Sequence, residues 1–197
     1  MKAKLLIVAL LVITVTGTTA SAQDPGDIGI FFDSGGTLTS GPVIAFVPFN
    51  VYVVAFDLSG GVLGYEGSIQ RDPNLILLTT IFSGPAPINV GTPENWIVGT
   101  GGCMAASGPT VLVQFQYFLA VPTAPADMLF CLGPSTPSSF APAAPGYLDC
   151  PGNLIPFTLA ANGGGIYPDG CAVGNPTQLP PVATEAESWG GLKALYR

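Results

Sequence analysis

The chain has 197 residues, of which 48% are hydrophobic and only 9% are charged, with 26 glycines, 20 prolines and no histidine. Its formal net charge is −7, and between Lys4 and Lys193 the only basic residue is Arg71. The chain therefore lacks the usual groups for acid–base catalysis near neutral pH and for binding phosphate, and its acidic balance excludes nucleic acid as a partner.

The first 22 residues are typical of an export signal. Lys2 and Lys4 form a short positive segment, residues 5–15 an apolar run, and residues 20–22 (Ala-Ser-Ala) a small-residue cleavage site. The apolar run is shorter than the roughly 20 residues that a membrane-spanning helix needs. We therefore expect a secreted or cell-surface protein that begins near Gln23 and has no transmembrane segment once the signal is removed.

Apolar segments separated by turn residues fill the first half of the mature chain. They predict strands over residues 28–32, 47–57, 62–70 and 75–82. The segment 47–57 is apolar on both faces, so we expect it to be a central strand. The segment 62–70 alternates between apolar and more polar positions, so one of its faces should meet water.

Strand signals continue in the second half, although most of them are shorter. Strands are predicted over residues 88–90, 95–98, 111–119, 128–132, 154–158 and 165–167. The clearest alternation lies in 111–119, where the odd-numbered positions are all apolar. Residues 134–145 are rich in Pro, Ser and Ala and are not expected to pair regularly.

These roughly eight to ten short strands predict an all-β domain over residues 23–178, with no helix of ordinary length before the tail. Two antiparallel sheets packed face to face, a β-sandwich, is the architecture that we favour. A closed barrel is the alternative.

Residues 179–197 form a proline-containing linker and a C-terminal tail of different composition. A Thr-x-x-Glu capping pattern precedes an apolar stripe, and Lys193 and Arg197 lie near the end. The stripe consists of Trp189, Leu192, Leu195 and Tyr196. The tail is similar to short endings of otherwise unrelated exported bacterial proteins, which gives the hypothesis of a recognition tag for sorting or surface attachment. An ordinary tail that docks on the domain or frays in solvent is the interpretation that we weight more heavily.

Four cysteines in an exported chain predict two disulfides, and they are Cys103, Cys131, Cys150 and Cys171. Three pairings are possible. We favour Cys103 with Cys131 and Cys150 with Cys171, because each pair closes a loop of about 20 to 30 residues, worth roughly 3 to 4 kcal/mol. Zinc binding is the competing interpretation, but the chain has neither histidine nor a Cys-x-x-Cys spacing.

Three segments carry a resemblance to a known family. They are residues 49–57 (FNVYVVAFD), 61–78 (GVLGYEGSIQRDPNLILL) and 110–120 (TVLVQFQYFLA). In this order they resemble a cohesin-like domain, a jelly-roll β-sandwich related to some carbohydrate-binding modules. The sequence departs from the family in its four cysteines and in its proline-rich segment 134–151. The resemblance implies a binding module: cohesins of cellulosome scaffolds bind dockerins, and cohesin-like domains also occur as isolated exported modules.

Two sets of polar residues on predicted strands are candidates for ligand binding. Glu66, Ser68 and Gln70 would share a polar face with Gln114 and Gln116 if their strands lie in one sheet. A flat face of this kind can bind a partner protein or a sugar chain through amide and hydroxyl hydrogen bonds. The alternative is ordinary solvation of an outer sheet face.

Aromatic residues in or beside predicted loops are further candidates. Trp96, Tyr147 and Tyr167 occupy such positions, where an exposed ring could stack against a sugar. The tyrosines on predicted strands are instead expected in the core: Tyr52, Tyr65 and Tyr117.

The carboxylates give few candidates for metal binding or catalysis. The aspartates mostly adjoin Gly, Pro or Asn, which predicts turn formation; calcium is left open, although no DxDxDG spacing is present. No other cofactor or metal is expected. Glu66 and Glu94 are the only glutamates before the tail, so a paired-carboxylate glycoside hydrolase is formally possible.

The sequence thus predicts an exported, disulfide-bonded β-sandwich that is not an enzyme and that binds an extracellular protein or polysaccharide, in adhesion or scaffolding. A structural cell-envelope or assembly subunit is the alternative function. A carboxylate-based glycoside hydrolase is a more distant one.

Overall fold

The computed structural model describes residues 23–161 and 166–177, and these form strands and loops only. The strands are β1 (Asp27–Phe31), β2 (Ser40–Gly41), β3 (Phe49–Phe56), β4 (Val62–Gln70), β5 (Leu75–Phe82), β6 (Ile88–Asn89), β7 (Asn95–Met104), β8 (Pro109–Leu119), β9 (Met128–Gly133), β10 (Gly146–Leu148), β11 (Leu154–Pro156), β12 (Thr158–Leu159) and β13 (Cys171–Gly174). Within these residues no helix is long and apolar enough to cross a membrane.

The first sheet has the order β12, β1, β3, β8, β5. Its central strand is β3, as the apolar faces of segment 47–57 predict. A bulge interrupts the β3–β8 pairing, because Val53 pairs with Val113 whereas Val54 pairs with Val111. The extra residue, Leu112, is therefore buried in the core beside Val113, and the alternation predicted over 111–119 holds only from Val113 onward.

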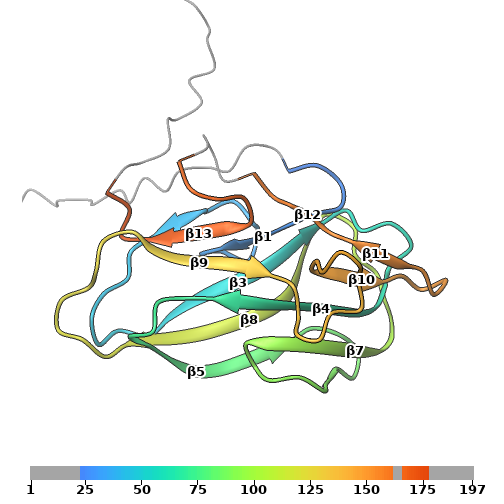
Figure 1. Ribbon diagram of the computed structural model, residues 1–197, viewed down its shortest axis with the longest axis horizontal. Helices are drawn as coiled ribbons and strands as arrows, with labels where there is room; N and C mark the ends of the chain where they lie inside the picture. Colours follow the sequence, from blue (N-terminus) through green and yellow to red (C-terminus); the bar gives the residue numbers. More distant parts are fainter. Residues whose placement is uncertain (1–22, 162–165, 178–197) are drawn as a thin grey trace, which may run out of the picture.

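The second sheet is built around β4 and packs on the first, so the prediction of a sandwich rather than a closed barrel is confirmed (Figure 1). One edge of β4 pairs with β7. Its other edge pairs with β10 near Tyr65 and with β9 near Ile69. The strands β13 and β2 continue this sheet beyond β9, and β11 lies outside β10.

An aromatic core fills the space between the sheets. Tyr117 and Phe115 come from the first sheet, and Trp96 and Phe130 come from the second. The ring centroids of Trp96 and Phe115 lie 5.6 Å apart, and those of Tyr117 and Phe130 lie 5.9 Å apart. Tyr65 is buried as predicted, and its hydroxyl donates to the Leu112 carbonyl at 2.7 Å and accepts from the Ser83 amide at 2.9 Å.

Two disulfides are present, but the predicted pairing is wrong. Cys103 is bonded to Cys150, and Cys131 is bonded to Cys171. The second bond forms because β13 lies beside β9, which makes Cys131 and Cys171 direct cross-strand partners. Loop length could not decide the pairing, because the entropy of closing a loop changes only with the logarithm of its length.

Most strands lie where the sequence predicts them, and the exceptions are short. The predicted strands at 62–70 and 75–82 are confirmed at both ends. The segments β2, β10 and β13 were not predicted, and residues 166 and 167 are not in a strand. The predicted strand 154–158 is divided into β11 and β12, which belong to different sheets, and β7 continues six residues beyond the predicted 95–98. The predicted signal peptide and the predicted C-terminal tag lie outside the residues that the structure describes.

Candidate functional site

The two sets of predicted polar residues lie on different sheets. Glu66, Ser68 and Gln70 belong to β4 in the second sheet, whereas Gln114 and Gln116 belong to β8 in the first. The prediction of one shared face is therefore wrong. Its condition, that β4 and β8 lie in one sheet, fails because β8 pairs with β3 and β5 instead.

On the outer face of the second sheet, the strands around β4 form the floor of an apolar groove. Gly64 in β4 lies in register with Gly99 of β7 on one side and with Leu148 of β10 on the other. The next outward-facing residue of β4 is Glu66. Because Gly64 and Gly99 have no side chains, this part of the floor is bare backbone.

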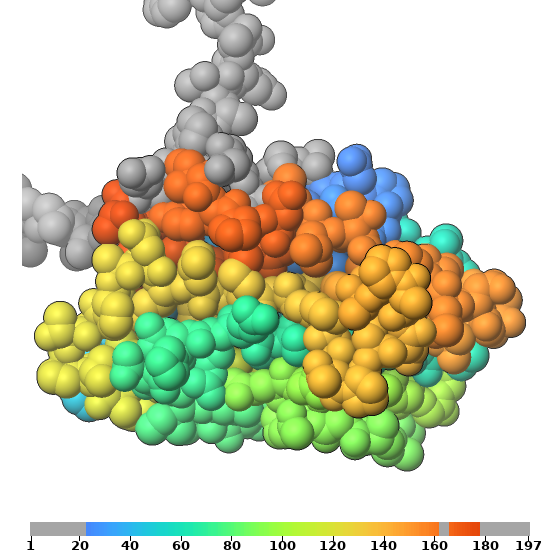
Figure 2. All heavy atoms as spheres, viewed as in Figure 1, coloured from blue at the N-terminus to red at the C-terminus, as the bar shows by residue number. Residues whose placement is uncertain are grey.

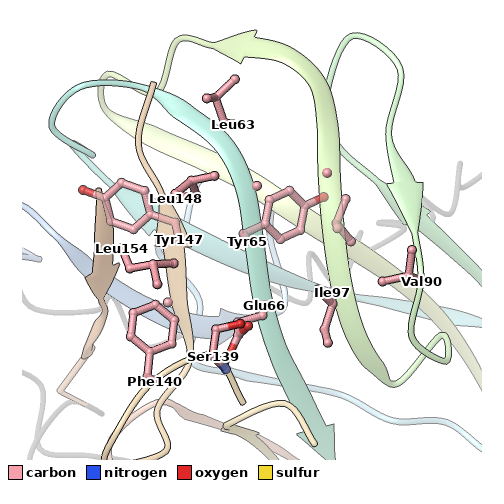
Figure 3. Close-up of a pocket in the computed structure, with 14 residues that line it drawn as sticks. Leu63, Tyr65, Glu66, Val90, Ile97, Ser139, Phe140, Tyr147, Leu148 and Leu154 are labelled. Carbon is pink, nitrogen blue, oxygen red and sulfur yellow. Dashed lines mark hydrogen bonds between the residues drawn. The ribbon is translucent and has the colours of Figure 1, made fainter. Parts of the chain in front are cut away.

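The walls of the groove come from loops and neighbouring strands. Phe140 and Ser139 belong to the proline-rich segment 134–145, which stands on this face of the molecule in amber (Figure 2). Figure 3 shows Phe140, Leu148 and Leu154 on one side of β4 and Ile97 and Val90 on the other. The groove has a volume of about 270 Å³, and among the described residues that line it only Glu66 is charged.

Glu66 is buried and is held by the proline-rich segment. Its Oε1 accepts hydrogen bonds from Ser135 Oγ at 2.9 Å, Ser138 Oγ at 3.0 Å and the Ser139 amide at 2.8 Å. Burial disfavours the charged form, but the bonds from Ser139, Ser135 and Ser138 together outweigh it and hold the pKa of Glu66 below its usual value. The Ser139 side chain also bonds to this carboxylate, so three serines orient the ionised group at the floor of the groove.

We expect Glu66 to make the stability of the fold depend on pH. Because its pKa is lowered only in the folded state, the unfolded chain binds the proton more tightly, and stability falls as pH drops below the usual glutamate pKa of about 4.3. Glu66→Gln should remove this contribution. Urea unfolding at a series of pH values from 7 to 3 should therefore give a shallower decline for Glu66→Gln than for the natural chain. Equal declines would contradict the lowered pKa of Glu66 in the folded state, since all other carboxylates are common to both proteins.

Ser68 and Gln70 follow Glu66 along β4 but do not join it in the groove. The Ser68 hydroxyl donates to the Pro134 carbonyl at 2.8 Å and so anchors the start of the proline-rich segment. Gln70 is exposed at the end of the strand. The structure thus gives Ser68 a structural contact and leaves Gln70 on the surface.

Of the three aromatic residues predicted to stack on sugars, two are buried. Trp96 is 2% exposed because β7 extends over ten residues and turns Trp96 and Val98 inward. Tyr147 is 3% exposed, with its ring stacked on Phe157 at a centroid distance of 5.1 Å. Tyr167 is partly buried and donates a hydrogen bond to Asp127 Oδ1 at 2.8 Å. The predicted exposure of Trp96 and Tyr147 is therefore wrong.

Glu94, the second glutamate, is engaged in an ion pair. Arg71 donates to both of its carboxylate oxygens, at 2.7 and 3.1 Å, and the Tyr117 hydroxyl donates to Oε1 at 3.0 Å. The hydrogen bonds to Glu94 raise the pKa of Arg71. Since the pKa of Glu66 is lowered, whereas a general acid needs a raised one, the hydrolase alternative gains no support from these residues.

Two aspartates act locally, as their turn context predicts, whereas Asp57 and Asp127 accept hydrogen bonds from residues distant in the sequence. Asp33 accepts hydrogen bonds from the amides of Gly35, Thr37 and Leu38, and Asp149 accepts one from the Asn153 amide. In residues 23–161 and 166–177, no group of three or more His, Cys, Asp or Glu side chains is placed to hold a metal ion.

Comparison with solved structures finds the same kind of sandwich in a cohesin module. That module belongs to a family 33 glycoside hydrolase of Clostridium perfringens ATCC13124; the alignment covers 81% of this chain and 97% of the module, with 12% sequence identity and a TM-score of 0.53. No protein-family model matches the sequence, and the comparison with curated proteins finds no match. The likeness confirms the predicted fold, a cohesin-like β-sandwich.

Proposed function

We propose that this chain is a non-catalytic extracellular binding module, whose groove beside β4 holds a short segment of a partner protein. The observation that carries the proposal is an apolar groove with one ionised carboxylate at its floor, Glu66, which three serines hold in place. The cohesin-like fold supports a binding role, and the two disulfides support an oxidising, extracellular setting.

The lining of the groove specifies the chemistry of its occupant. Val90 and Leu154 at the rim are 76% and 55% exposed, so apolar side chains of a partner would bury them. The carboxylate of Glu66 would pair with a cation, and the net charge of −7 favours approach of a basic partner. The occupant that fits best is a peptide segment with aliphatic side chains next to a Lys or Arg.

Gly99 provides a way to fill the groove without disturbing the fold. A Cβ added at Gly99 meets no atom within 4 Å, and its backbone does not adopt a positive φ. Gly99→Val should therefore place a side chain on the groove floor without a clash at Cβ, in a strand conformation that β-branched residues favour. Gly102→Val is the matched control, because Gly102 lies in the same strand outside the groove and its added Cβ makes only an ordinary contact with Pro85 at 3.7 Å.

A display library of random dodecapeptides, selected on the mature chain, tests the proposal. We expect enriched peptides to carry Lys or Arg beside aliphatic residues. Their affinity should fall at least tenfold, about 1.4 kcal/mol, for Gly99→Val and by about threefold or more for Glu66→Gln, and should not change for Gly102→Val. Equal binding by Gly99→Val and Gly102→Val, or no enrichment at all, would show that the groove is not a peptide site.

A further inference from the structure

The outer face of the first sheet carries a second set of aligned side chains, far from Glu66. The strands β3, β8 and β5 lie side by side, and their register sets two rows across this face. One row is Asn50, Gln116 and Thr79, and the other is Tyr52, Gln114 and Ile81. Two of the predicted ligand-binding residues, Gln114 and Gln116, thus lie beside a third amide, Asn50, and the ring of Tyr52. The prediction that Tyr52 lies in the core between the sheets is wrong, because this residue is half-buried on the outer face, where it packs against a smaller apolar cluster.

The amides of these rows have no partners within the described part of the chain. The side chains of Asn50, Gln114 and Gln116 make no hydrogen bond there. The Asn50 Oδ1 atom is buried, although it has no hydrogen-bond partner. A ligand cannot reach this atom in the present conformation, whereas Gln114 and Gln116 are only half-buried and leave their unpaired amides open to one.

A hollow of about 410 Å³ adjoins Asn50 and Tyr52. Its other walls are Phe32, Leu38, Ser40, Gly41, Pro42 and Phe49. The volume falls within the range of about 300 to 1,000 Å³ that is common for small-molecule sites. The face is therefore a hollow with an aromatic ring, continued by a flat strip of amides, and it can hold a chain that is longer than one residue.

The absence of charge selects the class of ligand. Neither the two rows nor the described lining of the hollow contains an Asp, Glu, Lys or Arg residue. Amide groups offer both donors and acceptors, which suits hydroxyl groups, and the Tyr52 ring offers an apolar face of the size of a pyranose ring. An anionic polysaccharide would find no cation here and would be repelled by the acidic chain.

From these observations we infer that the strip of Asn50, Tyr52, Gln114 and Gln116, which we name the amide face, is a binding site for a neutral polysaccharide. It lies on the opposite side of the sandwich from the groove of the proposed protein partner. One module would then hold a glycan with one sheet and a protein with the other, which is an arrangement suited to attaching a protein to a surface.

Affinity electrophoresis of the mature chain through gels that contain a soluble neutral polysaccharide tests the amide face. The probes are hydroxyethylcellulose, xyloglucan, galactomannan, laminarin and pullulan, with polygalacturonate as the anionic counterpart. We expect retardation by at least one neutral probe and none by polygalacturonate. Gln114→Ala/Gln116→Ala should weaken this binding at least tenfold, as should Tyr52→Ala.

Two control variants separate this site from the groove. Gln70→Ala removes an exposed amide from the opposite sheet, and Gly99→Val fills the groove; both should bind the polysaccharide like the natural chain. The inference is overturned if no neutral probe retards the chain, if the Gln114/Gln116 variant is retarded equally, or if polygalacturonate binds as well. It is also overturned if sedimentation shows that the natural chain self-associates through this face, that is, if the double variant no longer self-associates but still binds the glycan.

Discussion

Replacing both Cys131 and Cys171 with alanine should lower the free energy of unfolding by about 4 kcal/mol. The two residues are 40 positions apart in the sequence, and the bond restricts the unfolded chain by closing that loop. In the folded state they are cross-strand partners, and the bond ties the four-residue strand β13 to β9. The other neighbour of β13 is β2, which is only two residues long, so little else in the sheet holds β13 in place.

Urea unfolding under oxidising conditions measures this loss. Cys103→Ala/Cys150→Ala is the matched control, since its loop of similar length, 47 positions, should contribute about the same. Removing both bonds should cost less than the two losses added together, because the loops overlap in the sequence. A loss below about 1 kcal/mol for the Cys131/Cys171 variant would contradict the argument. So would a non-reducing peptide map that joined Cys103 to Cys131.

Strands that are half buried could be predicted from the sequence because burial on a pleated sheet leaves a period of two. The segment 62–70 shows this period and coincides with β4. The segment β13 could not be found in this way, since its four residues are all buried and show no alternation. Its existence depends on the free edge of β9, which is a property of the fold and not of the local sequence.

The groove could not be predicted for a related reason. Gly64 and Gly99 are 35 positions apart, and only the β4–β7 register brings them together to form a bare floor. The serines that hold Glu66 lie in a segment that the sequence marks only as irregular. The amide face was not predicted, because the segment 47–57 is apolar at most positions and so predicts a strand that is covered on both faces. In β3, however, Asn50 and Tyr52 alternate with the buried Val51 and Val53 and lie on the outer side of the sheet.

Trp96→Ala should destabilise the fold by about 3 to 5 kcal/mol, the cost of removing a large ring from a packed core. Its ring is buried and lies between the sheets, with its centroid 5.6 Å from that of Phe115. Trp96 also pairs in register with Gly67 of β4. A Cβ at Gly67 would lie only 2.9 Å from Cζ2 of the indole, so the glycine makes room for the ring. Chemical denaturation of the variant measures the loss.

A double-mutant cycle with Gly67→Ala tests whether Trp96 acts through this contact. Alone, Gly67→Ala should destabilise the protein by about 1 to 3 kcal/mol, because it overpacks the site. In the Trp96→Ala background the same change should be neutral or stabilising, since the new methyl group enters space that the indole has left. The two effects should therefore depart from additivity by at least about 1 kcal/mol. Additive effects would contradict a contact between the Trp96 ring and Gly67. A Trp96→Ala variant that keeps its stability and loses glycan binding would instead support the exposed, sugar-stacking role that the sequence context of Trp96 predicts.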